Sequence, residues 1–176
     1  MKSLSAENRR WADAWPDLGF VEAAAGKVLL CHGSPDRTNE FLYESELDDG
    51  RLNTWLDQFQ AAGLVCTHSG LPWIHRLADH RFAVNCGVIG KPDNDGDPAV
   101  HYALLEMSQS VVAFITIERV EYDFRQWADQ LTREGVDKVF VSPLRTGVWT
   151  CGASGLPTRE RKSRPRTVGS VVESAC

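Results

Sequence analysis

The sequence predicts an α/β fold with much antiparallel pairing between its strands. Segments with the 3.6-residue apolar period of an amphipathic helix alternate with short apolar runs that are typical of strands. Consecutive runs are mostly joined by short turns, and such turns connect antiparallel neighbours. The chain has 176 residues, of which 43% are apolar, so it is long enough for one domain with a sizeable core.

Residues 5–67 are predicted to form two helices and three strands. Ser5 can cap a helix that carries Trp11 and Trp15 on one face and stops before Pro16. The second helix has apolar residues at i, i+3, i+4 and i+7 and is expected to end at Gly63. The apolar period of this second helix runs from residue 52 to residue 59. The expected strands cover residues 20–23, 27–31 and 64–67.

The rest of the chain predicts two hairpins, a third helix and a last strand. Asp123 is a plausible cap for a helix whose apolar residues lie between positions 124 and 131. The apolar run at residues 139–141 is expected to form the last strand. The expected hairpins pair residues 74–77 with 82–85, and residues 100–107 with 111–119.

Charge and composition exclude several classes of protein. The net charge of −5 argues against a broad nucleic-acid surface. The apolar runs are too short to cross a bilayer, and the first ten residues lack the apolar core of a secretory signal. Five widely spread cysteines favour reduced thiols over a disulfide framework. We therefore expect a cytoplasmic protein that contacts no membrane.

The charge is distributed unevenly along the chain. Residues 151–176 hold five basic and two acidic residues, which gives +3 and leaves −8 for residues 1–150. The last segment is also rich in Gly, Ser, Pro and Thr and has no sustained apolar period. We expect one domain over residues 1–150 and a basic, disordered tail over residues 151–176, in preference to a nucleic-acid-binding arm.

Two histidines directly follow two of the predicted buried strands. His32 comes after residues 28–31, and His68 comes after residues 64–67. The carboxyl ends of neighbouring strands in an α/β sheet meet at one edge, where ligands usually bind. Imidazole nitrogens at these two positions could share a transition metal ion. The alternative is that each histidine only makes a hydrogen bond within its loop.

Three segments around these histidines carry a family resemblance. Residues 28–35, VLLCHGSP, resemble the HG-S-P segment of the calcineurin-like metallophosphoesterases. Residues 65–73, VCTHSGLPW, are similar to the V-C-G-H-T-H-L-P-W segment of that family. Residues 84–92, VNCGVIGKP, are similar to its V-N-P-G-S-V-G-Q-P, and D-G-D-P and Y-A-L-L follow in the same order. The order and spacing agree over roughly residues 4–120.

The resemblance implies a partial two-sheet α/β sandwich with mixed sheets flanked by helices. It also implies hydrolysis of a phosphate ester at a two-metal site. His32 and His68 match metal-binding histidines of the family, so a divalent transition metal (Mn, Fe or Zn) would be the cofactor. The second histidine of the family's G-H-T-H motif corresponds to Gly70, which has no side chain to bind a metal.

Other motifs of the family do not occur in this sequence. Its D-x-H, G-D and G-N-H elements are absent before His32, so the chain resembles the carboxyl-terminal part of such an enzyme. Asp36 and Glu40 lie nearby, but we expect them to be solvated loop charges. Two-metal catalysis by this chain alone is therefore not expected. Absent leading strands would leave open sheet edges, which predicts self-association.

Two further readings of the same residues remain open. The chain could be a non-catalytic remnant that acts through a partner surface. Residues 31–38 also fit the C-x5-R-[ST] loop of cysteine-dependent phosphatases, with Cys31 as nucleophile and Arg37 as phosphate ligand. Against this reading, Pro35 lacks a backbone N–H and Asp36 would repel phosphate.

Overall fold

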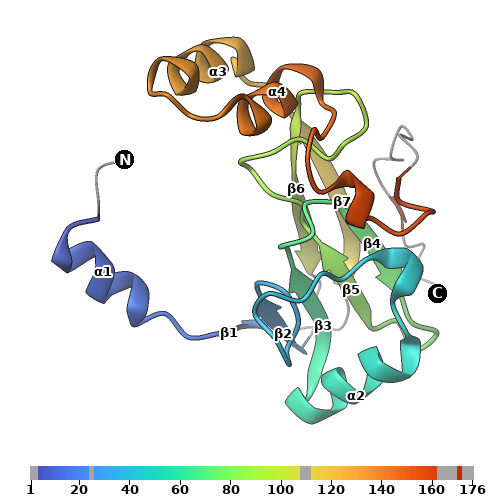
Figure 1. Ribbon diagram of the computed structural model, residues 1–176. Coiled ribbons are helices and arrows are strands. Elements are labelled where there is room, and N and C mark those ends of the chain that lie inside the picture. Colours follow the sequence, from blue (N-terminus) through green and yellow to red (C-terminus); the bar gives the residue numbers. More distant parts are fainter. Residues whose placement is uncertain (1–3, 24–25, 108–111, 162–169, 172–176) are drawn as a thin grey trace.

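Two β-sheets form the body of the molecule (Figure 1). The computed structural model describes residues 4–23, 26–107, 112–161 and 170–171. The strands are β1 (Leu18–Ala23), β2 (Gly26–Cys31), β3 (Ala61–Cys66), β4 (Trp73–Arg76), β5 (Phe82–Asn85), β6 (Val100–Met107), β7 (Val112–Val120) and β8 (Ser170–Val171). The helices are α1 (Ala6–Asp13), α2 (Asp49–Phe59), α3 (Phe124–Arg133) and α4 (Lys138–Thr146), with 3-10 turns η1 (Glu44–Glu46) and η2 (Ala153–Gly155).

The larger sheet has the strand order β1-β2-β3-β5-β4. Its three central strands β2, β3 and β5 run parallel, whereas the outer strands β1 and β4 pair antiparallel with their neighbours. The smaller sheet, β6-β7-β8, is antiparallel in its described part. The predicted α/β class and both predicted hairpins, β4–β5 and β6–β7, are confirmed.

One hydrophobic cluster joins the two sheets into a sandwich. Val28, Phe82 and Val84 come from the larger sheet. Ile115 and Ile117 come from β7 of the smaller sheet. Phe82, Val84 and Ile115 have no exposed surface at all. Apolar burial between these two faces therefore holds the sheets together, as the sandwich prediction requires.

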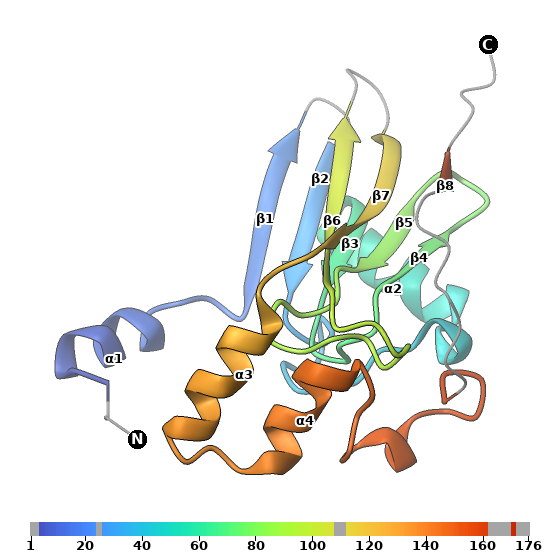
Figure 2. The same cartoon turned by 90° about the horizontal axis from the view of Figure 1, so that it is seen from above.

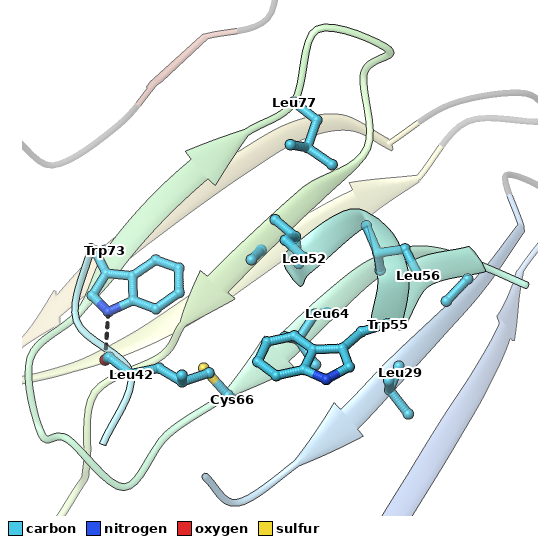
Figure 3. Close-up of a cluster of buried hydrophobic side chains, with 11 residues drawn as sticks. Leu29, Leu42, Leu52, Trp55, Leu56, Leu64, Cys66, Trp73 and Leu77 are labelled. Atoms are coloured by element: carbon cyan, nitrogen blue, oxygen red, sulfur yellow. Dashed lines mark hydrogen bonds between the residues drawn. The ribbon is translucent and has the colours of Figure 1, made fainter. Parts of the chain in front are cut away.

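Helix α2 covers the other face of the larger sheet (Figure 3). Asp48 caps the helix by accepting a hydrogen bond from the Arg51 N–H at 2.8 Å. Its apolar face presents Leu52, Trp55 and Leu56, which pack in one cluster with residues of β2 and β3. The predicted helix is confirmed by this packing.

The end of α2 differs from the expected position. The helix ends before Gln60, which adopts the left-handed conformation (φ 51°), so β3 begins three residues earlier than expected. Gly63 therefore lies inside β3 rather than at a helix end. A Cβ atom there would lie 2.1 Å from the Phe82 ring, so this close packing of β3 against β5 explains the glycine.

Helices α3 and α4 form an antiparallel pair beyond the end of the sheets at which β2 ends (Figure 2). Asp123 caps α3 as predicted, through the Gln126 N–H. The predicted strand at residues 139–141 is wrong, because these residues belong to α4. Val141 and Leu144, three residues apart, pack with Ala128 of α3 in one buried cluster. Helical spacing therefore decides the structure of this apolar run.

Helix α1 forms behind the predicted Ser5 cap, which accepts a hydrogen bond from the Asn8 N–H at 3.1 Å. None of its residues is buried. Trp11 and Trp15 contact each other edge to face, with ring centroids 4.5 Å apart, and each keeps 62% of its surface exposed. The helix extends away from the sandwich in both views (Figures 1 and 2).

The segment after α4 packs against the body in part. Leu156 is buried in a cluster with Leu71 and Trp149, so this packing crosses the expected domain boundary after residue 150. For residues 151–161 the structure thus differs from the expected disorder. The expectation for residues 162–169 and 172–176 falls outside the described residues. Within the described ranges, no helix combines the length and apolar content needed to cross a membrane.

Candidate metal centre

The two predicted histidines lie side by side at the carboxyl ends of β2 and β3. These strands are parallel neighbours, with Leu30 paired to Val65. A hydrogen bond of 3.0 Å from the Thr67 N–H to the His32 carbonyl continues this pairing past the strand ends. His32 and His68 follow on adjacent strands and therefore reach the same edge of the sheet, as the sequence predicted.

The imidazole rings of His32 and His68 face each other through one nitrogen each. Nε2 of His32 and Nδ1 of His68 are 2.8 Å apart, and the ring planes are inclined by 67°. Two nitrogens bound at about 2.0–2.1 Å to one ion would be roughly 2.8–3.4 Å apart at adjacent coordination positions. The pair can therefore face one transition metal ion, or share a proton as a hydrogen bond.

The protonation of His68 suits a ligand role. Burial lowers the pKa of its imidazole, and the neighbouring His32 lowers it further. A lowered pKa favours the neutral ring at neutral pH, and only the neutral ring has a lone pair for a metal.

A left-handed backbone at His68 aims its ring at His32. Its φ of 59° is uncommon for a residue with a side chain, and such conformations persist only where surrounding contacts enforce them. The fully buried Asn85 supplies those contacts. Its amide donates to the Thr67 carbonyl at 2.7 Å and to the Ser69 hydroxyl at 2.9 Å, and its carbonyl accepts from the Gly87 N–H at 3.0 Å.

Asp36 and Glu40 are held away from a ligand role by α2. Arg51 donates to both oxygens of Glu40 at 2.8 Å and to Asp36 at 3.0 Å. Asp36 also accepts from the Trp55 indole N–H at 3.0 Å. The structure thus replaces the expected solvated charges with an ion-pair network. In the described part of the chain, no group of three or more His, Cys, Asp or Glu side chains could hold a metal ion.

His32 and His68 therefore provide two of the ligands that one metal ion needs. They do not provide the larger set of ligands that a two-metal centre needs. A single ion held by two imidazoles has open positions for solvent and ligand. A two-metal centre needs a bridging anion and several more ligands. The described residues provide no carboxylate beside the histidine pair for that purpose.

The state of the Cys31 thiol argues against a cysteine-dependent phosphatase. Burial raises the pKa of its thiol to about 12, so the thiolate is scarce at neutral pH. Its Sγ donates to the Gly33 carbonyl at 3.5 Å. A thiol in this state is a poor nucleophile.

A cavity of about 450 Å3 opens beside His68. It lies next to Gly70, where a Cβ atom would meet the Trp149 ring at 3.3 Å. The Trp149 indole is fixed by a hydrogen bond from its N–H to the Pro92 carbonyl at 2.6 Å. The cavity is lined by Phe41, Tyr43, His68, Ser69, Gly70, Val88, Lys91, Trp149, Cys151, Gly152 and Gly155.

Sequence reasoning did not assign roles to Asn85, Lys91 or Trp149. Asn85 lies at the end of β5, directly beside the strand that leads to His68. A polar residue at the end of an apolar strand was a sequence feature that could have indicated a role at this edge of the sheet. Lys91 and Trp149 come from segments 58 residues apart, so only the fold brings them together.

Comparison with known structures identifies the fold. A metallophosphoesterase from Sphaerobacter thermophilus is 23% identical, with a TM-score of 0.63, over 82% of this chain and 63% of that chain. The hypothetical protein PH1004 from Pyrococcus horikoshii OT3 is 16% identical, with a TM-score of 0.65, over 82% of this chain and 56% of that chain. No family model and no curated protein matches the sequence. The fold is thus of the calcineurin-like metallophosphoesterase type, and the chain spans less than two thirds of either neighbour.

Proposed function

From this fold we propose that the chain is a metal-dependent phosphoric ester hydrolase homologue whose His32 and His68 hold one divalent transition-metal ion. The observation that carries the proposal is the approach of the two imidazole nitrogens to 2.8 Å at the carboxyl ends of parallel strands. Imidazole nitrogen suits Fe and Zn, and it binds Mn more weakly. When bound, such an ion polarises a phosphoryl oxygen and lowers the pKa of a bound water.

The chain's own residues account for the rest of the site. The imidazoles of His32 and His68 would hold the ion through the two nitrogens that face each other, and Asn85 keeps the loop of His68 in its left-handed conformation. The cavity beside His68 offers room for a phosphate ester. Positioning by rigid elements, more than flexible loops, gives such sites their precision.

A hydrolysis assay tests this proposal. p-Nitrophenyl phosphate and bis(p-nitrophenyl) phosphate would be incubated with the full chain and Mn²⁺. We expect turnover that is lost in His32→Ala and in His68→Ala. His80→Ala is the matched control, because His80 is exposed and also has a positive φ of 71° but lies outside the site. Turnover that survives both histidine substitutions would contradict the proposal.

A non-catalytic role is the second candidate, and one observation favours it. The described residues offer no third His, Cys, Asp or Glu side chain to hold the ion with His32 and His68. Metal binding measured by titration, with no turnover in the hydrolysis assay, would select this candidate. The cysteine-phosphatase alternative gains no support from the raised pKa of Cys31.

A further inference from the structure

Lys91 places a positive charge in the cavity beside the histidine pair. Its ammonium nitrogen is 3.4 Å from the centroid of the Trp149 ring. The lysine is half-buried, and its desolvation lowers its pKa. Within the described residues no carboxylate forms an ion pair with it. A partly desolvated ammonium gains most from an anion that enters its cavity.

Trp149 holds this ammonium in a fixed place. Its backbone N–H donates to the Asn94 side chain at 2.8 Å, and its indole N–H donates to the Pro92 carbonyl. The ring is 8% exposed and packs with Leu71 and Leu156. The cation therefore stands on a rigid aromatic face that is already built before a ligand arrives.

Another part of the cavity wall is aromatic and partly exposed. Phe41 lies against the His68 ring, with centroids 4.4 Å apart, and is nearly parallel to Tyr43 at 17°. Phe41 keeps 56% of its surface exposed. An exposed flat ring at the mouth of a cavity can stack against a flat organic group.

We propose that this cavity binds an organic phosphate, with its phosphoryl group held by Lys91 and a flat organic group lying against Phe41. Gly70 lines the cavity without a side chain, and a Cβ atom there would meet the Trp149 ring at 3.3 Å. Lys91 thus supplies a cationic contact in the same cavity that Gly70 lines. The choice of a phosphoryl group over another anion rests on the proposed function.

Titration calorimetry of the full chain with inorganic phosphate and with phenyl phosphate tests the proposal. EDTA in the buffer removes any contribution from a metal ion. We expect Lys91→Met to weaken both ligands about tenfold or more, and Lys91→Arg to retain most of the affinity. Lys27→Met is the matched control, because Lys27 also lies over an aromatic ring, that of Phe20 at 4.9 Å, but does not line the cavity. Circular dichroism checks that each variant is folded.

A second pair of variants tests the aromatic contact. Phe41→Ala should weaken phenyl phosphate and leave inorganic phosphate unchanged, whereas Phe140→Ala, on the exposed side of α4, should change neither. Absence of phosphate binding by the native chain, or equal affinities of Lys91→Met and Lys27→Met, would overturn the proposal. Benzoate that binds as tightly as phenyl phosphate would overturn the choice of a phosphoryl group.

Phosphate binding at Lys91 and metal binding at the histidine pair can be measured separately. A parallel titration with Mn²⁺ alone reports the histidine pair. His32→Ala should lose Mn²⁺ and keep phosphate binding in EDTA, whereas Lys91→Met should keep Mn²⁺ and lose phosphate. If Mn²⁺ does not bind but phosphate binding depends on Lys91, the proposed anion site is supported and the proposed metal site is contradicted.

Discussion

Asn85 is the residue on which the geometry of the histidine pair depends most. It is fully buried, and its side chain makes three hydrogen bonds to residues 67, 69 and 87. Removing a buried amide leaves each of these partners without its bond. The orientation of His68 is therefore set by a residue that is not itself a ligand.

Asn85→Ala should lower the free energy of unfolding by about 2–3 kcal/mol, because several buried polar groups lose their partners. Urea denaturation followed by fluorescence measures this change. Asn8→Ala, on the exposed face of α1, is the control and should stay within about 0.5 kcal/mol of the native chain. Equal stability of the two variants would mean that the loop is held by other contacts.

Glu40 should make the stability pH-dependent. The hydrogen bond from Arg51 holds the pKa of this carboxyl below its usual range, so the group binds its proton less readily in the folded chain. Its contribution is present above the pKa of the unfolded chain and is lost as pH falls through the lower folded pKa. Because the pair is partly exposed, the loss should be about 0.5 kcal/mol.

Urea midpoints across the acid range, for the native chain and for Glu40→Gln, measure this contribution. The difference between the two should shrink as pH falls. Glu22→Gln, at an exposed position of β1, is the matched control. A Glu40→Gln difference that is independent of pH would contradict the ion-pair account.

The cysteines should differ sharply in reactivity. Burial raises the pKa of the Cys31 and Cys66 thiols, whereas Cys151 is exposed. The thiolate is the reactive form, so iodoacetamide at neutral pH should modify Cys151 and leave Cys31 and Cys66 intact. Peptide mass spectrometry measures the labelled fraction, with urea-unfolded protein as the control. Rapid labelling of Cys31 in the folded chain would contradict this prediction and would support a cysteine-dependent phosphatase.

At the scale of elements, strand β3 packs closely against strand β5. Gly63 allows the Phe82 ring of β5 to lie directly over its backbone. Strand β3 leads to His68, and strand β5 ends at Asn85. The separation of these two strands therefore sets the distance between His68 and the Asn85 side chain that supports its loop.

Gly63→Ala should destabilise the fold by about 1–3 kcal/mol or more, because the added methyl overlaps the Phe82 ring. Chemical denaturation gives the value. Gly90→Ala is the control, because a Cβ atom there meets nothing within 4 Å. The double variant Gly63→Ala/Phe82→Leu should recover part of the loss, since the two side chains share one space. A Gly63→Ala chain as stable as Gly90→Ala would contradict the close packing.

Local patterns predicted most elements because caps and apolar periods are local signals. Ser5 and Asp123 cap α1 and α3 as expected. The strand expected at residues 139–141 failed because a run of three apolar residues fits a buried strand and a helix equally well. The Asp137 cap and Gly147 at the end of α4 were the local signals that favoured a helix.

The site was predictable only where it follows from strand order. His32 and His68 each follow a buried strand, and parallel neighbours bring their ends together. The contact between Lys91 and Trp149 depends on how the segment after α4 folds back, and no local pattern specifies that path. The Arg51 network likewise depends on where α2 lies against the loop that carries Asp36.

At the scale of the whole molecule, the sandwich leaves large apolar side chains exposed. Strands β1 and β6 lie at the described edges of their sheets. Exposed apolar residues on these strands include Phe20, Val21, Tyr102 and Leu104. Edge strands with apolar side chains favour association.

We predict concentration-dependent self-association of this chain, measured by sedimentation velocity. Leu104→Lys adds a charge to the edge strand β6 and should weaken association, because charged edges resist pairing. Phe140→Lys, at an exposed apolar position on α4, is the control. A native chain that stays monomeric at all concentrations would contradict the prediction.

The central claim is that His32 and His68 together bind one transition metal ion. Titration of the full chain with Co²⁺, followed by visible absorption, tests it most directly, because imidazole ligation changes the d–d spectrum. The account predicts a saturable band of one ion per chain that is lost in His32→Ala and in His68→Ala and kept in His80→Ala. A native chain without the band, or equal loss in all three variants, would contradict it.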